Sequence, residues 1–483
     1  MGTLVTDFLI YKWRYWIGYG LIALAFIGLL LFAVLYVPGG LSQQEIASTV
    51  KSAAVDVTNP ESMTVSSLPY ALAQKASFEL FGVSNFSIKL PSLITAFIAS
   101  VGAILLLRRW FKPNVAVLAT IIMVTTGQFL FVAQSGHTGI TYIMWSVWLL
   151  LSATMVTGSL KHKNIWLLTF FITAGLSLYT PLSLYLLLAI ISAAVLHPHV
   201  RYVLKKMALK KLLLFVFITL LLSAPLLYGI YLNPDFGLRL LGIPSTWPPN
   251  IFENAATLVQ QYVNFISPAS GVLMTPVFGL GSIALIILGA WQLFKNRYTA
   301  RSYTVTAWLI LLVPILLINP VYTSITFVPF LLLLASGLEY LFRSWYKMFP
   351  RNPYARIVGL IPLVVLVGGL VASGIDRYMY GYHYDPETAK SFSRDLTLLN
   401  RQVRTGESTT VLVSQSEKQF YDAVAKYDGK IINNESQLTV TTTVPSGAFA
   451  ASRMANSAVR DRQIDAIIVT SHSEDSDRFY LYK

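Results

Sequence analysis

The stretch Ile17–Val37, IGYGLIALAFIGLLLFAVLYV, decides the class of this protein. It carries no charged residue and is long enough to cross a bilayer core, which takes roughly 20 apolar residues in a helix. No small-residue cleavage site follows it, so we interpret it as a retained membrane span rather than a signal peptide. Hydrophobic residues make up 55% of the 483 residues and charged residues only 12%. Such a chain buries its excess apolar surface in lipid.

Further apolar segments follow along the chain. We predict eleven membrane-spanning helices, at residues 17–37, 92–107, 114–132, 139–158, 164–179, 182–197, 212–232, 271–294, 302–319, 323–342 and 357–375. The two segments around Tyr179-Thr180-Pro181 could also form one span, kinked by the proline. The expected fold is therefore a mainly α-helical, polytopic bundle embedded in the lipid bilayer.

The basic residues predict how this bundle is oriented. One set of loops holds most of the lysines and arginines, whereas the opposite loops hold only Lys51, Lys75, Lys89 and Arg239. The basic set faces the cytoplasm by the positive-inside rule, so we expect a multi-pass protein of the cell membrane with a cytoplasmic N-terminus. The net charge of +14 has the same origin. No basic stripe is interleaved with aromatic residues, so we predict no nucleic-acid partner.

Two long outer loops and a polar C-terminal part complete the predicted domain organisation. The membrane domain covers residues 1–375 and includes outer loops at 38–90 and 233–271, the first with helices at 42–54 and 67–81. Residues 376–483 form a small extracytoplasmic α/β domain. We expect strands at 409–414, 464–470 and 478–481, helices at 415–427 and 451–462, and a mostly parallel sheet.

A family resemblance lies in residues 69–112. A Pro69-Tyr70 helix leads to LFGVS at 80–84, then to KLPS at 89–92 at the start of a span, and then to a basic turn, RRWF, at 108–111. This order resembles the GT-C superfamily of polyprenyl-phosphate-sugar-dependent glycosyltransferases, in the branch with the aminoarabinose transferase and the protein O-mannosyltransferases. Residues 175–181 and 319–322 resemble two further turns of that family. The resemblance extends over residues 17–375 and implies transfer of a sugar outside the cytoplasm.

The resemblance also implies catalytic positions, and this chain departs from them. The family's acidic pair after the first span falls on Gln44, which is neutral, and on Glu45. Glu45 is the only general base that this motif offers, because a glutamine cannot accept a proton at neutral pH. Glu45 also stands three residues after Ser42, a spacing typical of a helix capping box. Both roles stay open, and a capping box would hold the carboxylate at the membrane surface.

The family's second acidic motif is also changed. Its arginine falls on Gln134 and its aspartate falls near Gly139, so His137 is the one titratable group of that turn. His137 is a candidate acid or base, or a partner of Glu45, although a lone histidine at a helix end is often only a cap. Glu45 and His137 are too few ligands for tight metal binding, so a divalent cation would need phosphate oxygens to complete its shell. The absence of cysteine excludes disulfides and thiolate chemistry.

A lipid-phosphate donor requires cations near the membrane surface. The candidates that we expect to contact substrate are Lys75, Lys89 and Arg239, together with Gln44 and Gln134. Lys89 could instead mark the membrane edge by snorkelling, and Lys75 could face solvent. Trp247 is a candidate for stacking on a sugar, or it anchors its loop at the membrane interface.

Three functions are compatible with these patterns. The one we favour is a glycosyltransferase that moves a sugar from a polyprenyl-phosphate carrier to an extracytoplasmic acceptor, which could be a glycan, a lipid or a protein. The alternative is a catalytically degenerate relative that binds lipid-linked glycan or serves as a scaffold in envelope assembly, and the missing acids favour it. A transporter is disfavoured, because no charged residues are paired deep inside the predicted spans.

Overall fold

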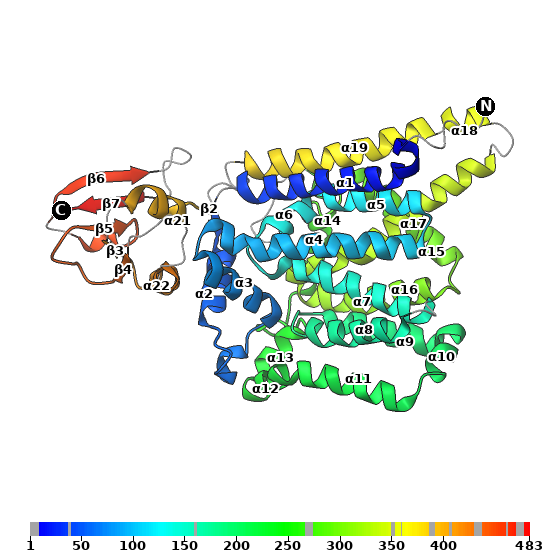
Figure 1. The fold of residues 1–483 in the computed structure, drawn as a ribbon, viewed down its shortest axis with the longest axis horizontal. Coiled ribbons are helices and arrows are strands. Elements are labelled where there is room, and N and C mark those ends of the chain that lie inside the picture. Colours follow the sequence, from blue (N-terminus) through cyan, green and yellow to red (C-terminus); the bar gives the residue numbers. More distant parts are fainter. Residues whose placement is uncertain are drawn as a thin grey trace.

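The fold was analysed in a computed structural model of the chain. It describes residues 9–36, 40–158, 162–265, 274–348, 353–358, 360–385, 392–404, 408–428, 437–459, 462–469 and 478–483. A long helical bundle lies at one side, with a small sheet-containing part at the end marked by the C-terminus (Figure 1). The fold class expected from the sequence, a helical membrane bundle with a small C-terminal α/β part, is confirmed.

Each predicted span overlaps a helix or a helix pair. The span predicted at 271–294 overlaps a helix only from Leu280, because residues 271–273 lie outside the described residues and 274–279 are not helical. The bundle is built from α1 (Leu9–Tyr36), α4 (Asn85–Trp110), α5 (Pro113–Thr125), α6 (Gly127–Gln134), η2 (Thr138–Ile140), α7 (Thr141–Gly158), α8 (Lys163–Ser177), α9 (Ser183–Leu196), α10 (Pro198–Lys205), α11 (Leu209–Leu222), α12 (Ala224–Leu232), α15 (Leu280–Lys295), α16 (Ala300–Ile318), η3 (Pro320–Thr326), α17 (Phe327–Met348), α18 (Pro353–Val358), α19 (Leu360–Tyr378) and η4 (Met379–His383). By length and composition, five described helices could cross a membrane, or eight if each bent pair is one span. This number is smaller than the eleven predicted, partly because several helices are short.

Three pairs of consecutive helices are sharply bent. Helices α5 and α6 meet at 60°, α9 and α10 at 92°, and α11 and α12 at 49°. Pro198 and Pro225 stand in the first turn of α10 and α12, where a proline fits because its missing N–H has no helical partner. Residues 178–182 separate α8 from α9, so this pair is two helices rather than one kinked span.

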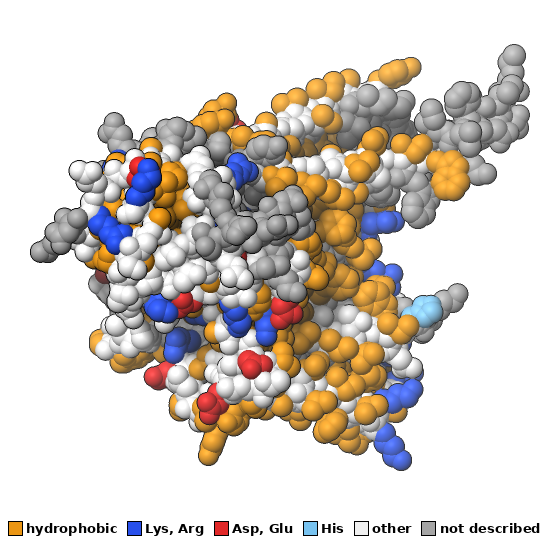
Figure 2. All heavy atoms as spheres, turned by 60° about the vertical axis from the view of Figure 1, so that its left-hand side comes forward, with side chains coloured by type: hydrophobic (Ala, Val, Ile, Leu, Met, Phe, Trp, Pro, Cys, Tyr) orange, Lys and Arg blue, Asp and Glu red, His pale blue; other side chains and the backbone are white. Residues whose placement is uncertain are grey.

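The side of the bundle is apolar, as a membrane protein requires. Large hydrophobic side chains of α1, α11 and α19 are exposed, among them Leu24, Phe217 and Val364. Figure 2 shows hydrophobic side chains over much of the bundle's flank. In water this surface would be costly, whereas in lipid it costs nothing.

Short helices cover one end of the bundle, next to the C-terminal part (Figure 1). They are α2 (Gln43–Ala54), η1 (Pro60–Met63), α3 (Leu68–Phe81), α13 (Pro234–Leu240) and α14 (Ile251–Val263). The helices predicted at 42–54 and 67–81 are therefore confirmed within one residue. This end carries the candidate site.

The C-terminal part is a mixed five-stranded sheet rather than the mostly parallel one predicted. Its elements are β2 (Phe392–Ser393), α21 (Asp395–Leu398), η5 (Leu399–Val403), β3 (Ser408–Leu412), α22 (Lys418–Lys426), β4 (Gln437–Thr441), β5 (Phe449–Ser452), η7 (Asn456–Ala458), β6 (Ile464–Val469) and β7 (Arg478–Tyr482). In the order β4-β3-β5-β7-β6, β3 pairs parallel with β4 and β5, whereas β7 pairs antiparallel with β5 and β6.

The antiparallel pairing of β7 with β5 and β6 makes the sheet mixed, and two of its strands were also missing from the prediction. The helix expected at 451–462 is wrong, because residues 449–452 form the central strand β5 and a single 3-10 turn follows. The strand β4 was not predicted. Its residues alternate in burial, but the threonine-rich sequence QLTVT gives a weak hydrophobic signal.

The C-terminal part packs directly on α2 and α3 at this end of the bundle. Strand β1 (Leu41–Ser42) pairs antiparallel with β2, and one hydrophobic cluster joins Leu41, Ala53 and Phe78 with Leu399 and Tyr427. Lys426 Nζ also donates a hydrogen bond of 2.9 Å to the carbonyl of Ala53 at the end of α2. Helix α2 is therefore held between the bundle and the C-terminal part.

Candidate functional site

Helix α2 begins with a capping box, in which the carboxylate of Glu45 is buried. The N–H of Glu45 donates to Ser42 Oγ, and Glu45 Oε2 accepts 2.7 Å from the N–H of Ser42. The predicted box is confirmed. Glu45 is only 1% exposed, and it does not face bulk solvent or lipid.

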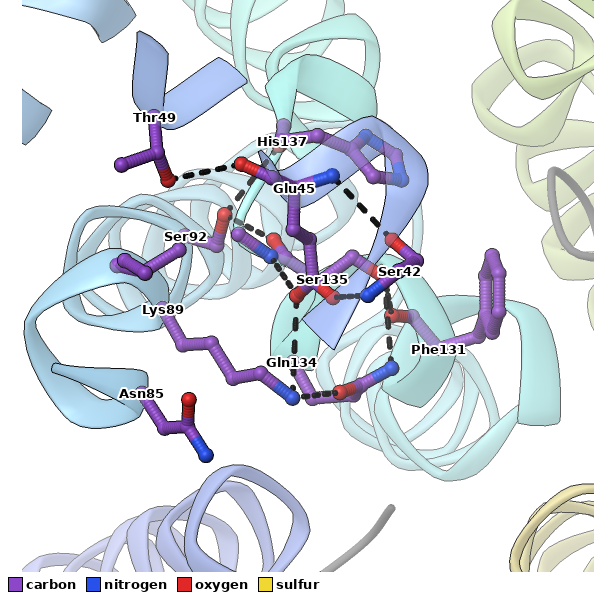
Figure 3. A network of polar contacts seen from close by, with 12 residues as sticks. Ser42, Glu45, Thr49, Asn85, Lys89, Ser92, Phe131, Gln134, Ser135 and His137 are labelled. Carbon is purple, nitrogen blue, oxygen red and sulfur yellow. Dashed lines mark hydrogen bonds and ion pairs between the residues drawn. The ribbon is translucent and has the colours of Figure 1, made fainter. Parts of the chain in front are cut away.

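Glu45 also reaches across to the bundle. Its Oε1 accepts a hydrogen bond of 2.6 Å from the N–H of Gly136, in the turn between α6 and η2. The ammonium of Lys89, on the first turns of α4, lies 3.8 Å from the same oxygen. Figure 3 shows Lys89 extending from α4 toward Glu45 and Gln134. One carboxylate thus links three segments that are distant in the sequence.

Lys89 does not snorkel to the membrane surface. It is 1% exposed, and its Nζ donates a hydrogen bond of 3.1 Å to Gln134 Oε1. Gln134 Nε2 in turn donates 2.9 Å to the hydroxyl of Tyr382, from the end of η4. We call Glu45, Lys89, Gln134 and Tyr382 the outer polar network. A buried charge requires such partners, because an unpaired one is very costly.

Gln74 belongs to the same region and was missed by sequence reasoning. It is fully buried, accepts from the hydroxyls of Ser48 and Ser52 on α2, and donates to the carbonyls of Ile88 and Gly136. It stands four residues after Tyr70, on the same face of α3, and the Tyr70 hydroxyl bonds to Ser92. That four-residue spacing of Tyr70 and Gln74 on one helix face was the available signal. No sequence pattern pointed to Tyr382, because it lies 248 residues from its hydrogen-bond partner Gln134.

His137 lies next to this network without a hydrogen bond to Glu45. Its Nδ1 accepts 3.0 Å from the N–H of Gly139 and so caps η2, which requires the proton of a neutral imidazole to sit on Nε2. Nε2 is buried, and no partner for it is found among the described residues. Burial lowers the pKa of His137 below its usual value of 6.5, and the charge of Glu45 offsets part of that effect.

The remaining predicted residues do not join the outer polar network. Lys75 bonds to the carbonyl of Val55 at 2.9 Å and pairs with Glu79 at 3.7 Å. Arg239 is exposed on α13 and bonds to the carbonyl of Asp235. Trp247 is 70% exposed, and Gln44 is half-buried beside Glu45. The structure therefore brings together Glu45, Lys89 and Gln134, with His137 adjacent, and leaves the other four apart.

A metal site finds little support in these side chains. No group of three or more His, Asp or Glu residues that could hold an ion occurs in the part of the chain that the structure describes. The divalent cation considered from the sequence stays a prediction.

The shifted pKa of His137 predicts a pH dependence of stability. As pH falls below 6.5, the unfolded chain protonates this imidazole, whereas the folded chain resists doing so. The free energy of unfolding should therefore fall on acidification. Replacing His137 by Asn keeps a capping acceptor and removes the titration. We expect the thermal midpoint of the variant to drop less than that of the wild type between pH 7 and pH 5. Equal drops would contradict this assignment.

Comparison with known proteins shows which family model and which folds this chain resembles. Residues 67–228, about a third of the chain, match the family model of dolichyl-phosphate-mannose-protein mannosyltransferases. The sequence matches none of the curated proteins with which it was compared. The fold matches the crystal structure of ArnT from Cupriavidus metallidurans in the apo state, with a TM-score of 0.51 and 12% identity over 96% of this chain and 98% of that one. The match spans both the bundle and the C-terminal part. The chain has the GT-C fold.

Two further solved structures match the chain at lower TM-scores. ArnT from Cupriavidus metallidurans bound to undecaprenyl phosphate gives a TM-score of 0.50 and 13% identity, over 96% of this chain and 98% of that one. An oligosaccharyltransferase from Archaeoglobus fulgidus gives 0.49 and 12%, over 89% of this chain and 64% of that one. Within the GT-C fold, the outer polar network lies where α2, α4 and the turn at residues 135–137 meet.

Proposed function

We propose that this protein is a membrane glycosyltransferase that transfers a sugar from a polyprenyl-phosphate-linked donor to an extracytoplasmic acceptor. The observation that carries the proposal is the buried Glu45–Lys89 pair, 3.8 Å apart, at one end of a GT-C bundle. The match of residues 67–228 to a family of dolichyl-phosphate-dependent mannosyltransferases supports the lipid-phosphate donor. The acceptor, a glycan, lipid or protein, is not specified by these contacts.

The pair supplies the two groups that this reaction needs. An acceptor hydroxyl attacks the anomeric carbon, the bond from that carbon to the phosphate oxygen breaks, and the polyprenyl phosphate leaves. Glu45 is the base that takes the hydroxyl proton, and the ammonium of Lys89 neutralises the leaving phosphate. A donor phosphate competes with the carboxylate for Lys89 and draws the ammonium away from Glu45 Oε1, which keeps its hydrogen bond from the N–H of Gly136.

This mechanism requires that the substrates can reach Glu45 and Lys89. Both oxygens of Glu45 are occupied, and both side chains are almost fully buried. Opening the site therefore requires α2 to move away from α4. The C-terminal part holds α2 through β1–β2 pairing and through Lys426, so we propose that its position sets how easily the site opens.

The proposed topology follows the charge distribution. The loops rich in lysine and arginine lie on the cytoplasmic side, and the N-terminus is cytoplasmic. The outer polar network and the domain from residue 376 are then extracytoplasmic. The division into a membrane domain, 1–375, and a C-terminal domain, 376–483, is part of this proposal.

The test must separate chemistry from stability. Glu45→Gln alone leaves the Lys89 charge buried without its partner, so a loss of activity could come from misfolding. The double variant Glu45→Gln with Lys89→Met removes both charges. We expect it to fold and to release polyprenyl phosphate from polyprenyl-phosphate sugars at least ~100-fold more slowly than the wild type, the loss typical of a missing acid–base group. A folded double variant with wild-type turnover would overturn the proposed roles of both residues.

A second candidate function rests on the hydrogen bonds that already engage both carboxylate oxygens of Glu45. In a degenerate relative that only binds lipid-linked glycan, the pair would be a structural clamp, which its saturated hydrogen bonding favours. A binding and turnover assay of the wild-type protein in membranes decides between the enzyme and the binding protein. Binding of polyprenyl-phosphate sugars without any turnover supports the binding protein, and turnover supports the enzyme.

A further inference from the structure

A large cavity lies inside the bundle, between α7, α8, α9, α11 and α16. Its volume is about 680 Å³, within the range of roughly 300–1,000 Å³ that small-molecule sites occupy. Its wall is apolar, with Leu167, Phe170, Phe171, Ile190 and Leu212 among the lining residues. The shape and chemistry of this wall suit a hydrocarbon chain.

One end of the cavity lies at the predicted cytoplasmic surface. Val200 and Leu204 of α10 line it there, and α10 turns by 92° from α9, so that it lies across the end of the bundle. The exposed side of α10 carries Arg201 and Lys205. A short helix with an apolar side and a basic side, lying across a membrane span, is typical of the headgroup region of a bilayer.

Two arginines line the same cavity. Arg109 ends α4 and donates 2.9 Å to the carbonyl of Gly158, and Arg301 begins α16 and donates to the carbonyl of Trp110. Each guanidinium has five N–H donors, and each makes one hydrogen bond within the part of the chain that the structure describes, so most of its donor capacity is left for a ligand. Arg301 also lies over the ring of Phe111. No acidic side chain lines the cavity among the described residues. The charge of Glu339 acts on Arg301, but its carboxylate accepts a hydrogen bond from Arg343.

This cavity is separate from the outer polar network. Lys89 and Arg109 stand on the same helix, α4, and are about 30 Å apart along its axis at a rise of roughly 1.5 Å per residue. A molecule held by Arg109 and Arg301 therefore cannot reach Glu45 with its head group.

We propose that this cavity binds one acyl chain of an anionic phospholipid, whose phosphate lies between Arg109 and Arg301. The apolar wall takes the chain, the two guanidinium groups take the phosphate, and the basic side of α10 favours an anionic head group over a zwitterionic one. The lipid enters from the leaflet in which α10 lies. This inference does not depend on the glycosyltransferase proposal.

Photolabelling of the protein in nanodiscs tests the proposed lipid site. The probes are phosphatidylglycerol and phosphatidylcholine with a diazirine on one acyl chain, and labelled peptides are mapped by mass spectrometry. Labelling of α8 and α9 is normalised to labelling of α19, whose lipid-facing side chains both probes reach. We expect severalfold more normalised labelling by the phosphatidylglycerol probe. Equal labelling by the two probes would overturn the proposal.

Two variants and a control sharpen the test. Ala153→Phe, which adds a ring to the cavity wall, should lower the labelling of α8 and α9 by both probes. Arg301→Gln should abolish the preference for phosphatidylglycerol and leave the phosphatidylcholine signal unchanged. Arg297→Gln removes an exposed charge at the same end of the bundle and should have no effect. If Ala153→Phe does not fold, the Arg301→Gln and Arg297→Gln pair decides, and equal behaviour of those two variants would refute the site.

Discussion

Replacing Lys89 by methionine is expected to destabilise the protein by about 3–5 kcal/mol, the usual cost of breaking a buried ion pair. The carboxylate of Glu45 would stay buried between α2 and the turn at residues 135–137, with two backbone N–H donors but no compensating charge. Gln134 would also lose its donor. The effect is measured by following unfolding while a denaturing detergent is titrated into protein held in a mild detergent.

The double variant provides the internal check. Glu45→Gln with Lys89→Met should recover most of the loss, because the two residues interact directly and their effects are not additive. Lys75→Met is the matched control, since Lys75 is partly exposed and its ion pair is worth less than about 1 kcal/mol. If the single and double variants lose stability additively, Glu45 and Lys89 do not form the pair described here.

The second large effect is expected at the contact between α15 and α17. A Cβ added to Gly289 would lie 1.8 Å from the carbonyl oxygen of Leu333, and one added to Gly337 would lie 2.2 Å from that of Leu285. These are backbone atoms, which cannot rotate away. Gly289→Val should therefore push the two helices apart and cost about 3 kcal/mol or more. The same detergent titration measures it.

Gly368 offers the control for that substitution. It lies on α19, and an added Cβ there would meet nothing within 4 Å. Gly368→Ala should be neutral or stabilising by up to about 1 kcal/mol, because alanine favours the helix over glycine. A similar loss at both positions would mean that the close approach of α15 and α17 is not what makes the Gly289 substitution costly.

Burial of the Glu45–Lys89 pair has a consequence for function. Two opposite charges in a low-dielectric site hold each other firmly, so the described conformation is a closed one. The energy for opening must come from a ligand that binds the open form better, and the phosphodiester anion of the proposed donor, facing Lys89, is of that kind. The C-terminal part is placed to influence this step, because β2 and α22 contact the two ends of α2.

Local sequence patterns predicted the helical elements well. Long apolar runs fixed the membrane helices, since a span has to satisfy its backbone hydrogen bonds internally. The Ser42-x-x-Glu45 spacing predicted a real capping box, because both partners lie within one turn. The C-terminal sheet was predicted less well. The pairing of β7 with both β5 and β6 depends on contacts between distant strands, which local periodicity does not encode.

The sequence by itself determined that this is a helical membrane protein, and it singled out Glu45, Lys89, Gln134 and His137 as candidates. Only the tertiary structure decided that Glu45 pairs with Lys89, that Gln134 links Lys89 to Tyr382, and that Lys75, Arg239 and Trp247 stay outside this network. The physical reason is the distance along the chain over which each interaction acts. Hydrophobicity and capping act within a few residues, whereas a buried charge is satisfied by whichever groups the packing of distant helices brings to it.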